Sequence, residues 1–332
     1  MARKVLIIRF SSIGDIVLTS PIVRSLAHQE PDISIHYLTK PAFTSILQTN
    51  PHVDRVHALK PKLIDTLQEL KQEKFDLILD LHHNLRTLIV KNFLGVKSYA
   101  FPKGNWEKYQ MVKWKKKDIS LPHIVERYAD VLRPLGVRLD EQGLDFFISQ
   151  EEKVAAADFL MENDFGSYAK QFYALVIGAK HHTKRWPNTH VISLIHQLAQ
   201  PVILIGGTGE LADAEQIAKA VGRAPVLSAV GRTNLQVSAA LLSMAQVVIT
   251  PDTGMMHIAA ALQKPIISIW GNTVPEFGMY PYKTRHATLE VQELGCRPCS
   301  KIGFDRCPKG HFSCMVENTP ERVQEAIRKI QS

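Results

Sequence analysis

The chain has 332 residues, of which 45% are apolar and 22% are charged, as in ordinary soluble globular proteins. This length suits two domains better than one. No run of about 18 apolar residues occurs, which excludes a membrane-spanning helix, and the short apolar run at the N-terminus lacks the cleavage site of a signal peptide. We therefore expect a cytoplasmic protein.

The first strand, turn and helix contain an unusual acid. Residues Lys4–Phe10 predict a buried parallel strand, and Ile16–Ala27 predict the helix that follows it. The turn between them, SSIGD, is neither a Walker loop nor a dinucleotide-binding fingerprint. Asp15 is either a first-turn acid that favours the helix dipole or a general base at the carboxyl end of the strand, where open α/β sheets bind their ligands.

The first half continues to alternate between strands and helices. Polar side chains follow the buried strand Phe75–Leu81, where they either line the ligand edge of the sheet or cap the next helix; they are His82, His83, Asn84 and Arg86. The other expected strands are 33–38, 53–59 and 95–100, and the other expected helices are 41–48, 63–73, 85–94 and 125–135.

The formal net charge of +8 is concentrated in Lys103–Lys117, KGNWEKYQMVKWKKK. Trp106, Tyr109 and Trp114 are interleaved with its lysines. Such a segment suits an anionic membrane surface, a phosphorylated glycolipid or a nucleic acid. A solvated loop is the commoner explanation of an isolated run of charges.

A domain boundary is expected where the alternation stops. After Gly143 the sequence has no strand–turn–helix signal, and a second series begins near residue 172. We place an N-terminal domain at 1–155 and a C-terminal domain at 156–332. Two such series predict an α/β protein with two doubly wound, Rossmann-like domains facing each other across a cleft. The second series has expected strands at 172–177, 202–205, 226–229, 247–249 and 266–270, and expected helices at 189–199, 234–244, 255–262 and 319–330, with another ending near 221.

Residues Pro251–Pro275 organise this second series as a turn, a helix and a strand. The turn offers a carboxylate, a hydroxyl and a glycine in Asp252, Thr253 and Gly254, and His257 follows one helical turn later. Free N–H groups and the positive dipole end at such a helix start attract anions such as phosphate. An ordinary N-cap is the alternative. Capping requires neither Gly254 nor His257, so we favour an anion site.

All four cysteines lie in one stretch before the C-terminal helix: Cys296, Cys299, Cys307 and Cys314. A Cys-x2-Cys pair followed by two more cysteines suits tetrahedral zinc, and a cytoplasmic location argues against stable disulfides. Four thiolates would close the coordination sphere, so such an ion would be structural. Four reduced thiols, or disulfides formed only on purification, are the alternatives.

Three motifs together resemble one family. RFSSIGDIVLTSPIVRSL, the Lys184–Pro187 element KRWP, and DTGMMHIAAALQKPIISIWGNTVP occur in this order, as in the glycosyltransferase family 9 heptosyltransferases. The resemblance implies a GT-B architecture and an inverting transfer from a nucleotide–heptose donor held mainly by the C-terminal domain. It also implies ADP-heptose as the donor and a lipopolysaccharide core acceptor of the lipid A–Kdo type. From the basic segment Lys103–Lys117 we expect peripheral contact with the anionic inner membrane surface.

The resemblance also assigns residues. Asp15 matches the family's proposed catalytic base, and Lys184 matches a lysine that contacts the donor phosphates. The expected donor-binding residues are Lys184, Glu210, Asp252, Thr253, Gly254 and His257, and the expected acceptor-binding residues are Ser12, Gly14, His82, Asn84 and Arg86.

The expected chemistry needs one base and no second carboxylate nucleophile. A cation and a helix N-terminus near the departing diphosphate would stabilise the transition state, a role that suits Lys184 and the N–H groups near Gly254. Because the chain also has no D-x-D motif, we expect no cofactor for catalysis.

Two other functions stay open. A transferase or epimerase that uses another nucleotide sugar could share this architecture, since a fold does not determine function. A nucleic-acid-binding protein would explain the positive charge, but no RNA- or DNA-binding motif accompanies it, and we expect no nucleic-acid partner.

Overall fold

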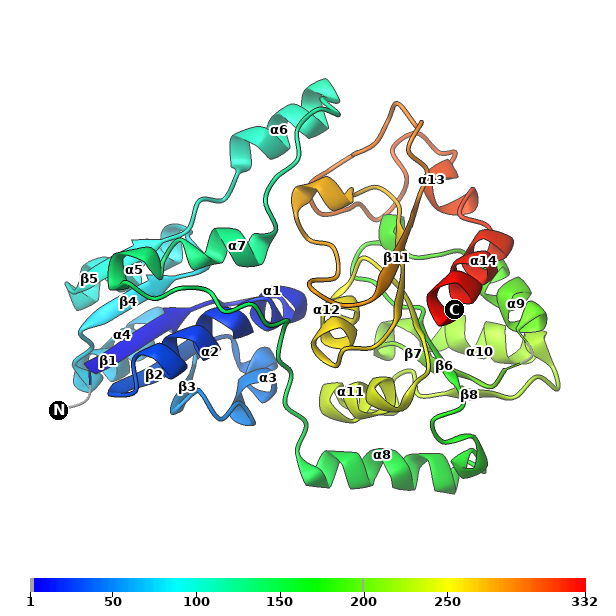
Figure 1. Ribbon diagram of the computed structural model, residues 1–332, viewed down its shortest axis with the longest axis horizontal. Helices are drawn as coiled ribbons and strands as arrows, with labels where there is room; N and C mark the ends of the chain where they lie inside the picture. Colours follow the sequence, from blue (N-terminus) through cyan, green and yellow to red (C-terminus); the bar gives the residue numbers. More distant parts are fainter. Residues whose placement is uncertain (1–2, 199) are drawn as a thin grey trace. The chain divides into compact units, whose positions relative to one another are not determined.

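The structure is a computed structural model that describes residues 3–198 and 200–332. The chain divides into two compact units (Figure 1). The first comprises the residues up to Gly104 together with Pro122–Phe147, and the second comprises Asn105–Leu121 and Ile148–Ser332. The predicted boundary at 155 therefore lies inside a helix of the second unit. The segment 105–121, which we placed in the N-terminal domain, belongs to the second unit.

The first unit is built on a parallel sheet of five strands in the order β3-β2-β1-β4-β5. Both faces of the central strand are buried: Leu6 and Ile8 on one face belong to a core cluster with Leu70 and Val90 from two helices, and Val5 and Ile7 on the other face are also buried. The elements of this unit are β1 (Arg3–Ile8), α1 (Ile13–Val17), α2 (Ser20–Gln29), β2 (Ile33–Thr39), η1 (Pro41–Phe43), α3 (Ser45–Gln48), β3 (Arg55–Ala58), α4 (Leu63–Glu73), β4 (Leu77–Asp80), α5 (Leu85–Leu94), β5 (Lys97–Ala100), α7 (Ile124–Ala129) and η2 (Arg133–Leu135).

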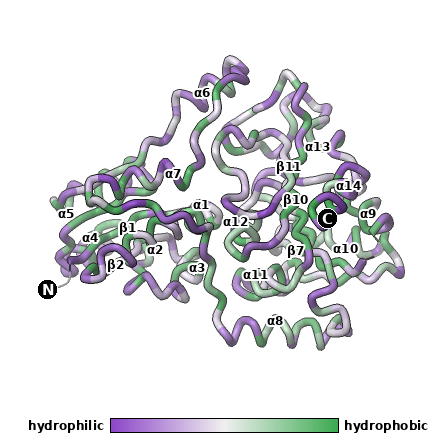
Figure 2. The backbone as a smooth tube through the Cα atoms, in the orientation of Figure 1, coloured by the Kyte–Doolittle hydropathy of each residue, from purple (hydrophilic) through white to green (hydrophobic). Residues whose placement is uncertain are grey.

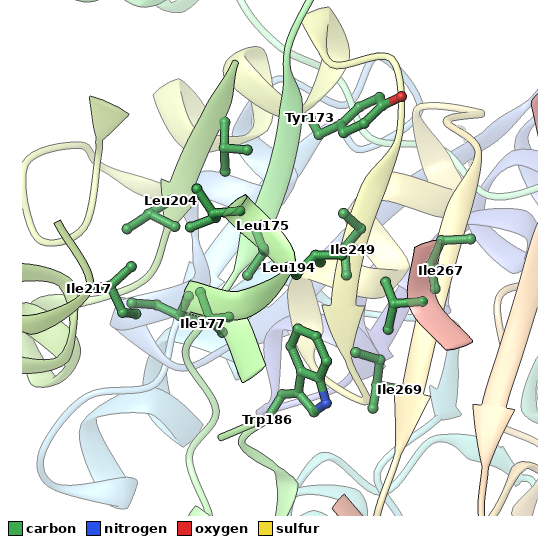
Figure 3. Packing of buried hydrophobic residues seen from close by; sticks show 14 of the residues in the cluster. Tyr173, Leu175, Ile177, Trp186, Leu194, Leu204, Ile217, Ile249, Ile267 and Ile269 are labelled. Carbon is green, nitrogen blue, oxygen red and sulfur yellow. The ribbon is translucent and has the colours of Figure 1, made fainter. Parts of the chain in front are cut away.

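The second unit has a parallel sheet of six strands in the order β11-β10-β9-β6-β7-β8. Its main core lies between this sheet and α9, α10 and α14 (Figure 3). The elements are α6 (Asn105–Trp114), α8 (Gln150–Glu162), η3 (Gly166–Tyr168), β6 (Tyr173–Val176), η4 (His182–Lys184), α9 (Asn188–Gln197), β7 (Val202–Ile205), η5 (Thr208–Glu210), α10 (Leu211–Val221), β8 (Val226–Ser228), α11 (Leu235–Met244), β9 (Val248–Pro251), α12 (Gly254–Ala261), β10 (Ile266–Trp270), η6 (Pro275–Phe277), β11 (His286–Glu290), α13 (Ser313–Val316) and α14 (Pro320–Gln331).

The predicted α/β class and the two doubly wound sheets are confirmed, because both sheets are parallel and carry helices between their strands. The strand β7 (VILI) is hydrophobic along its length (Figure 2), as expected for a strand covered on both faces. Within residues 3–198 and 200–332, no helix is both long and apolar enough to cross a membrane.

Several local predictions were wrong. The expected helix 16–27 is two helices, α1 and α2, separated at Leu18–Thr19 just before Pro21. The basic segment is not a loop, because it contains α6. The stretch after Gly143 contains α8, and β11 and α13 were not expected. The predicted last residue of the helix 189–199, Ala199, lies outside the described residues.

Candidate active site

Asp15 lies in the turn that follows the central strand β1. Ser12 precedes α1 as its N-cap residue. Asp15 Oδ2 accepts hydrogen bonds from Ser12 Oγ at 2.7 Å and from Ser12 N at 3.1 Å. The carboxylate is therefore a first-turn acid, as one interpretation predicted. Its other oxygen, Oδ1, pairs with Arg9 Nη2 at 2.6 Å. Gly14 is buried within α1.

Arg9 was missed by the sequence reasoning. Its guanidinium also donates to Leu81 O at 2.6 Å and to Ser11 O at 2.8 Å, so it joins the carboxyl ends of β1 and β4 to Asp15. Its side chain is only 11% exposed. An arginine directly after an apolar strand, Lys4–Ile8, was the signal that could have identified it, because a cation there needs a carboxylate partner.

The polar residues after β4 divide into two groups. His82 is half-buried and its ring packs edge-on against Phe10 at 5.0 Å. Burial, and then the charges of Arg9 and Lys103, lower the pKa of His82 to about 4, although Asp15 opposes the shift. His82 is therefore neutral at pH 7 and lies within electrostatic range of Asp15.

Asn84 and Arg86 are exposed. Asn84 Oδ1 accepts the Thr87 N–H at 3.0 Å as the N-cap of α5, so the capping interpretation accounts for this residue. Arg86 lies with its guanidinium carbon 5.8 Å from the centre of the Phe10 ring. Phe10 thus lies between Arg86 and His82, which brings these two predicted residues to the same edge of the first sheet.

In the second unit, three neighbouring strands bring a lysine, an aspartate and a threonine together. Lys184 follows β6, and its Nζ lies 2.6 Å from Asp252 Oδ2. Asp252 follows β9, and Thr273, which follows β10, donates to the same oxygen at 2.8 Å. The strands are adjacent in the order β10-β9-β6. Thr273 was not predicted, although a polar residue after the strand Ile266–Trp270 matches the pattern of the other two.

The start of α12 lies directly after Asp252. Thr253 is its N-cap in extended conformation and makes no side-chain cap hydrogen bond. Gly254 is its first residue, and His257 is buried one turn later. The first N–H groups of a helix have no partner within the helix, and here Thr253 does not cap them. This geometry suits an anion beside Lys184.

Glu210 lies in η5, which follows the next strand, β7, and both of its carboxylate oxygens have partners. Its Oε1 pairs with Arg185 Nη2 at 2.7 Å, and its Oε2 accepts the Gly207 N–H at 3.0 Å. A Cβ at Gly178 would lie 2.7 Å from Oε2, so glycine is needed there for this approach. Lys184 and Arg185, which are neighbours in sequence, thus hold the carboxylates after β9 and β7.

The stretch that contains the four cysteines forms hydrogen bonds with the loop that follows β10. The buried Arg297 donates to Thr273 O at 2.9 Å and to Glu290 at 2.9 Å, and Cys299 N donates to Asn272 O at 2.9 Å. Burial raises the pKa of Cys314 to about 12 and, together with Cys296, raises that of Cys299 to about 11. All four cysteines are free thiols.

Among the described residues, the group whose ligand atoms all lie within 4.8 Å is a different one: His36, His57 and Glu73. His36 Nδ1 lies 2.9 Å from His57 Nε2, and His57 Nδ1 lies 2.9 Å from Glu69. Glu73 pairs with Lys4 at 3.0 Å. These contacts form a closed network of hydrogen bonds and ion pairs that needs no metal ion.

This network predicts a pH dependence of stability. Burial, and then His57, lower the pKa of His36 below its usual value. The unfolded chain therefore binds a proton near pH 6.5 that the folded chain does not, so the free energy of unfolding should fall as pH decreases through about 6.5. Calorimetric melting from pH 8 to pH 5 should show this loss. It should be shallower in His36→Asn and unchanged in His286→Asn, a control at an exposed histidine; equal slopes in all three proteins would contradict the prediction.

Comparisons with known proteins identify the family. Residues 64–306 match the model described as glycosyltransferase family 9 (heptosyltransferase). Lipopolysaccharide heptosyltransferase 3 of Escherichia coli is 26% identical over 284 residues, covering 78% of this chain and 81% of the relative.

Solved structures share the fold over nearly the whole chain. The glycosyl transferase family 9 protein of Veillonella parvula has a TM-score of 0.81 and 21% identity, with coverage of 99% of this chain and 97% of that one. The ADP-heptose LPS heptosyltransferase II of E. coli has a TM-score of 0.77 and 20% identity, with coverage of 98% of each chain. The predicted GT-B fold with two Rossmann-like domains is confirmed. Since the family model spans well over half of the sequence, the chain belongs to glycosyltransferase family 9, the heptosyltransferases.

Proposed function

We propose that this chain transfers heptose from ADP-heptose to the inner core of lipopolysaccharide, on an acceptor of the lipid A–Kdo type. The observation that carries the proposal is the convergence of Lys184, Asp252 and Thr273 beside the uncapped start of α12. A cation beside a helix start that the Thr253 side chain does not cap suits the diphosphate of a nucleotide sugar. The names of the relatives support heptose as the sugar.

Asp15 is the proposed general base of an inverting transfer. The acceptor oxygen forms a bond to the anomeric carbon, the bond from that carbon to the diphosphate breaks, and the hydroxyl proton passes to Asp15. Arg9 and Ser12 fix the carboxylate from two sides, which limits its rotation before the reaction. Ser12, Gly14, His82, Asn84 and Arg86 are proposed to border the acceptor, since they lie at the carboxyl ends of β1 and β4.

Lys184 and the first N–H groups of α12 are proposed to stabilise the negative charge that develops on the departing ADP. Glu210 is proposed to accept hydrogen bonds from the ribose hydroxyls. Each of its carboxylate oxygens can accept a further hydrogen bond besides those from Arg185 and Gly207. These groups would supply the electrostatic stabilisation without a catalytic metal ion.

The test is ADP release with ADP-heptose and with ADP-glucose, each with and without heptose-deficient lipid A–Kdo acceptor. We expect release that depends on both ADP-heptose and the acceptor. Release only with ADP-glucose would assign another nucleotide sugar, and rearrangement of the sugar without ADP release would favour an epimerase.

We also propose a structural zinc ion at Cys296, Cys299, Cys307 and Cys314. The support is the Cys-x2-Cys pair followed by two more cysteines in one stretch. Among the described residues no three of these sulfurs lie within 4.8 Å of one another, so binding would require the stretch to close around the ion. Elemental analysis of protein purified without chelator or metal-affinity resin should find about one zinc per chain. Iron should be measured beside zinc, because four sulfur ligands suit either metal. Less than about 0.2 metal ions per chain, with four freely titrating thiols, would contradict the proposal.

A further inference from the structure

The helix α6 has two different faces. On one, Met111 is buried with Val274 and Phe277, and Val112 packs against the same cluster. On the other, three large aromatic side chains are exposed to solvent: Trp106 is 59% exposed, Tyr109 42% and Trp114 52%. Helices of soluble proteins usually bury their aromatic residues. On α6 the aromatic side chains are on the exposed face instead of the buried one. We take this as an indication that the exposed face contacts a partner.

The three exposed rings form one cluster. The Trp106 and Tyr109 rings are stacked at 5.7 Å with an interplanar angle of 10°. Trp114 meets Trp106 edge-on at 5.5 Å and Tyr109 at 5.7 Å. Because the rings cover part of one another's faces, the cluster is poorly arranged for stacking on unpaired bases. It presents a compact apolar surface with polar N–H and O–H groups, as side chains at a membrane interface do.

Hydrogen bonds connect α6 and the residues after it to the rest of the second unit. Lys115 Nζ donates to the carbonyls of Cys296 at 3.0 Å and Pro298 at 2.6 Å, and Leu121 N donates to Glu276 O at 2.9 Å. Lys301 Nζ donates to Asn105 O at 3.2 Å. The cysteine stretch therefore runs beside both ends of α6 and supports it.

The cysteine stretch also exposes apolar and basic side chains. Ile302 follows Lys301 directly and is 64% exposed. Lys113 and Lys116 are exposed at the end of α6, and Arg306 and Lys309 are exposed on the cysteine stretch. Lys113 and Lys116 are near the rings in sequence, and cations beside an apolar cluster are complementary to a bilayer with anionic head groups.

We propose that the ring cluster of Trp106, Tyr109 and Trp114, with Lys113 and Lys116, is a docking surface for an anionic lipid bilayer. The inference rests on the proposed function, because an enzyme with a lipid-anchored acceptor must work at a membrane surface. The rings enter the interfacial region, and the lysines bind the anionic head groups.

The position of the tryptophans allows a direct measurement. The chain has four tryptophans, and the other two, Trp186 and Trp270, are buried. Quenching of tryptophan fluorescence by vesicles with brominated acyl chains therefore reports on Trp106 and Trp114. We expect quenching and a blue shift with phosphatidylglycerol-containing vesicles in low salt. Both effects should be much weaker with purely zwitterionic vesicles or in about 0.5 M salt.

Variants test the two parts of the surface by vesicle co-sedimentation. Lys113→Gln with Lys116→Gln should weaken partitioning about 30-fold, since each lysine contributes about five-fold near an anionic leaflet. Trp106→Ser with Trp114→Ser should weaken it at least about tenfold. The matched control is Lys153→Gln with Met161→Ser on α8, which removes one exposed lysine and an apolar side chain that is 69% exposed. It should bind vesicles like the wild type.

Three results would overturn the proposal: no quenching by anionic vesicles in low salt, equal losses in the control variant, or tighter binding to a single-stranded oligonucleotide than to the vesicles. Transfer to a delipidated soluble acceptor needs no bilayer and tests the proposed function separately. The α6 variants should keep that activity. If vesicles bind but no transfer occurs, the proposed function fails and the docking surface stands.

Discussion

Replacing Asp15 with asparagine should lower kcat for sugar transfer by about 10²–10⁴-fold, the usual cost of losing a general base. The substitution removes the carboxylate that would accept the proton, but an amide oxygen can still accept the hydrogen bonds from Ser12. The cap of α1 should therefore survive. Affinity for ADP should change little, because the proposed donor site belongs to the other unit. Steady-state transfer and calorimetric ADP binding measure the two quantities.

The control for this variant is Asp65→Asn. Asp65 is also a first-turn acid, at the start of α4, and it is exposed. Its substitution removes the same charge from a helix start in the same unit, so it should leave kcat unchanged. If Asp15→Asn retains more than about a tenth of the wild-type kcat, Asp15 only stabilises its helix. Equal losses in both variants would point to a general effect of charge.

The sequence predicted best the elements whose signals are local. The bounds expected for α4, α5, β7 and β10 agree with the structure, because apolar periodicity and flanking turn residues mark them. The single helix 16–27 was wrong because Pro21 lies in the first turn of a new helix, α2, which begins at Ser20. The helix α6 was missed because only Met111 is fully buried along it, so its apolar pattern is weak.

In the candidate site, too, the sequence predicted residues with a local signal but not the contacts between strands. Asp15 and Asp252 follow strands and could be recognised from that position, whereas Lys184 was recognised through the family resemblance. Arg9 and Thr273 could not be assigned partners, because their contacts depend on which strands are neighbours in the sheet. Arg9 reaches Leu81 because β1 pairs with β4, and Thr273 reaches Asp252 because β10 pairs with β9. Strand order is a property of the tertiary fold, and the sequence carries it only weakly.

Replacing Lys184 with alanine should weaken ADP binding by about 10- to 150-fold, since a hydrogen bond to a charged group contributes about 1.5–3 kcal/mol. Two effects add in this variant. The cation that would face the diphosphate is lost, and Asp252, which Lys184 contacts at 2.6 Å, is left with an uncompensated negative charge that repels the phosphates. The loss should be small for adenosine, which has no diphosphate. Calorimetric titration with ADP and with adenosine separates the two ligands.

A double-mutant cycle with Asp252→Asn distinguishes the two effects. If Lys184 only neutralises Asp252, the double variant should recover most of the affinity for ADP. If Lys184 binds the diphosphate, the double variant should stay weak, which is the result we expect. Lys180→Ala is the matched control, because Lys180 is an exposed lysine in the same loop after β6, and it should bind ADP normally. Equal losses for adenosine and ADP in Lys184→Ala would show that this lysine supports the fold of the loop and does not contact the donor phosphates.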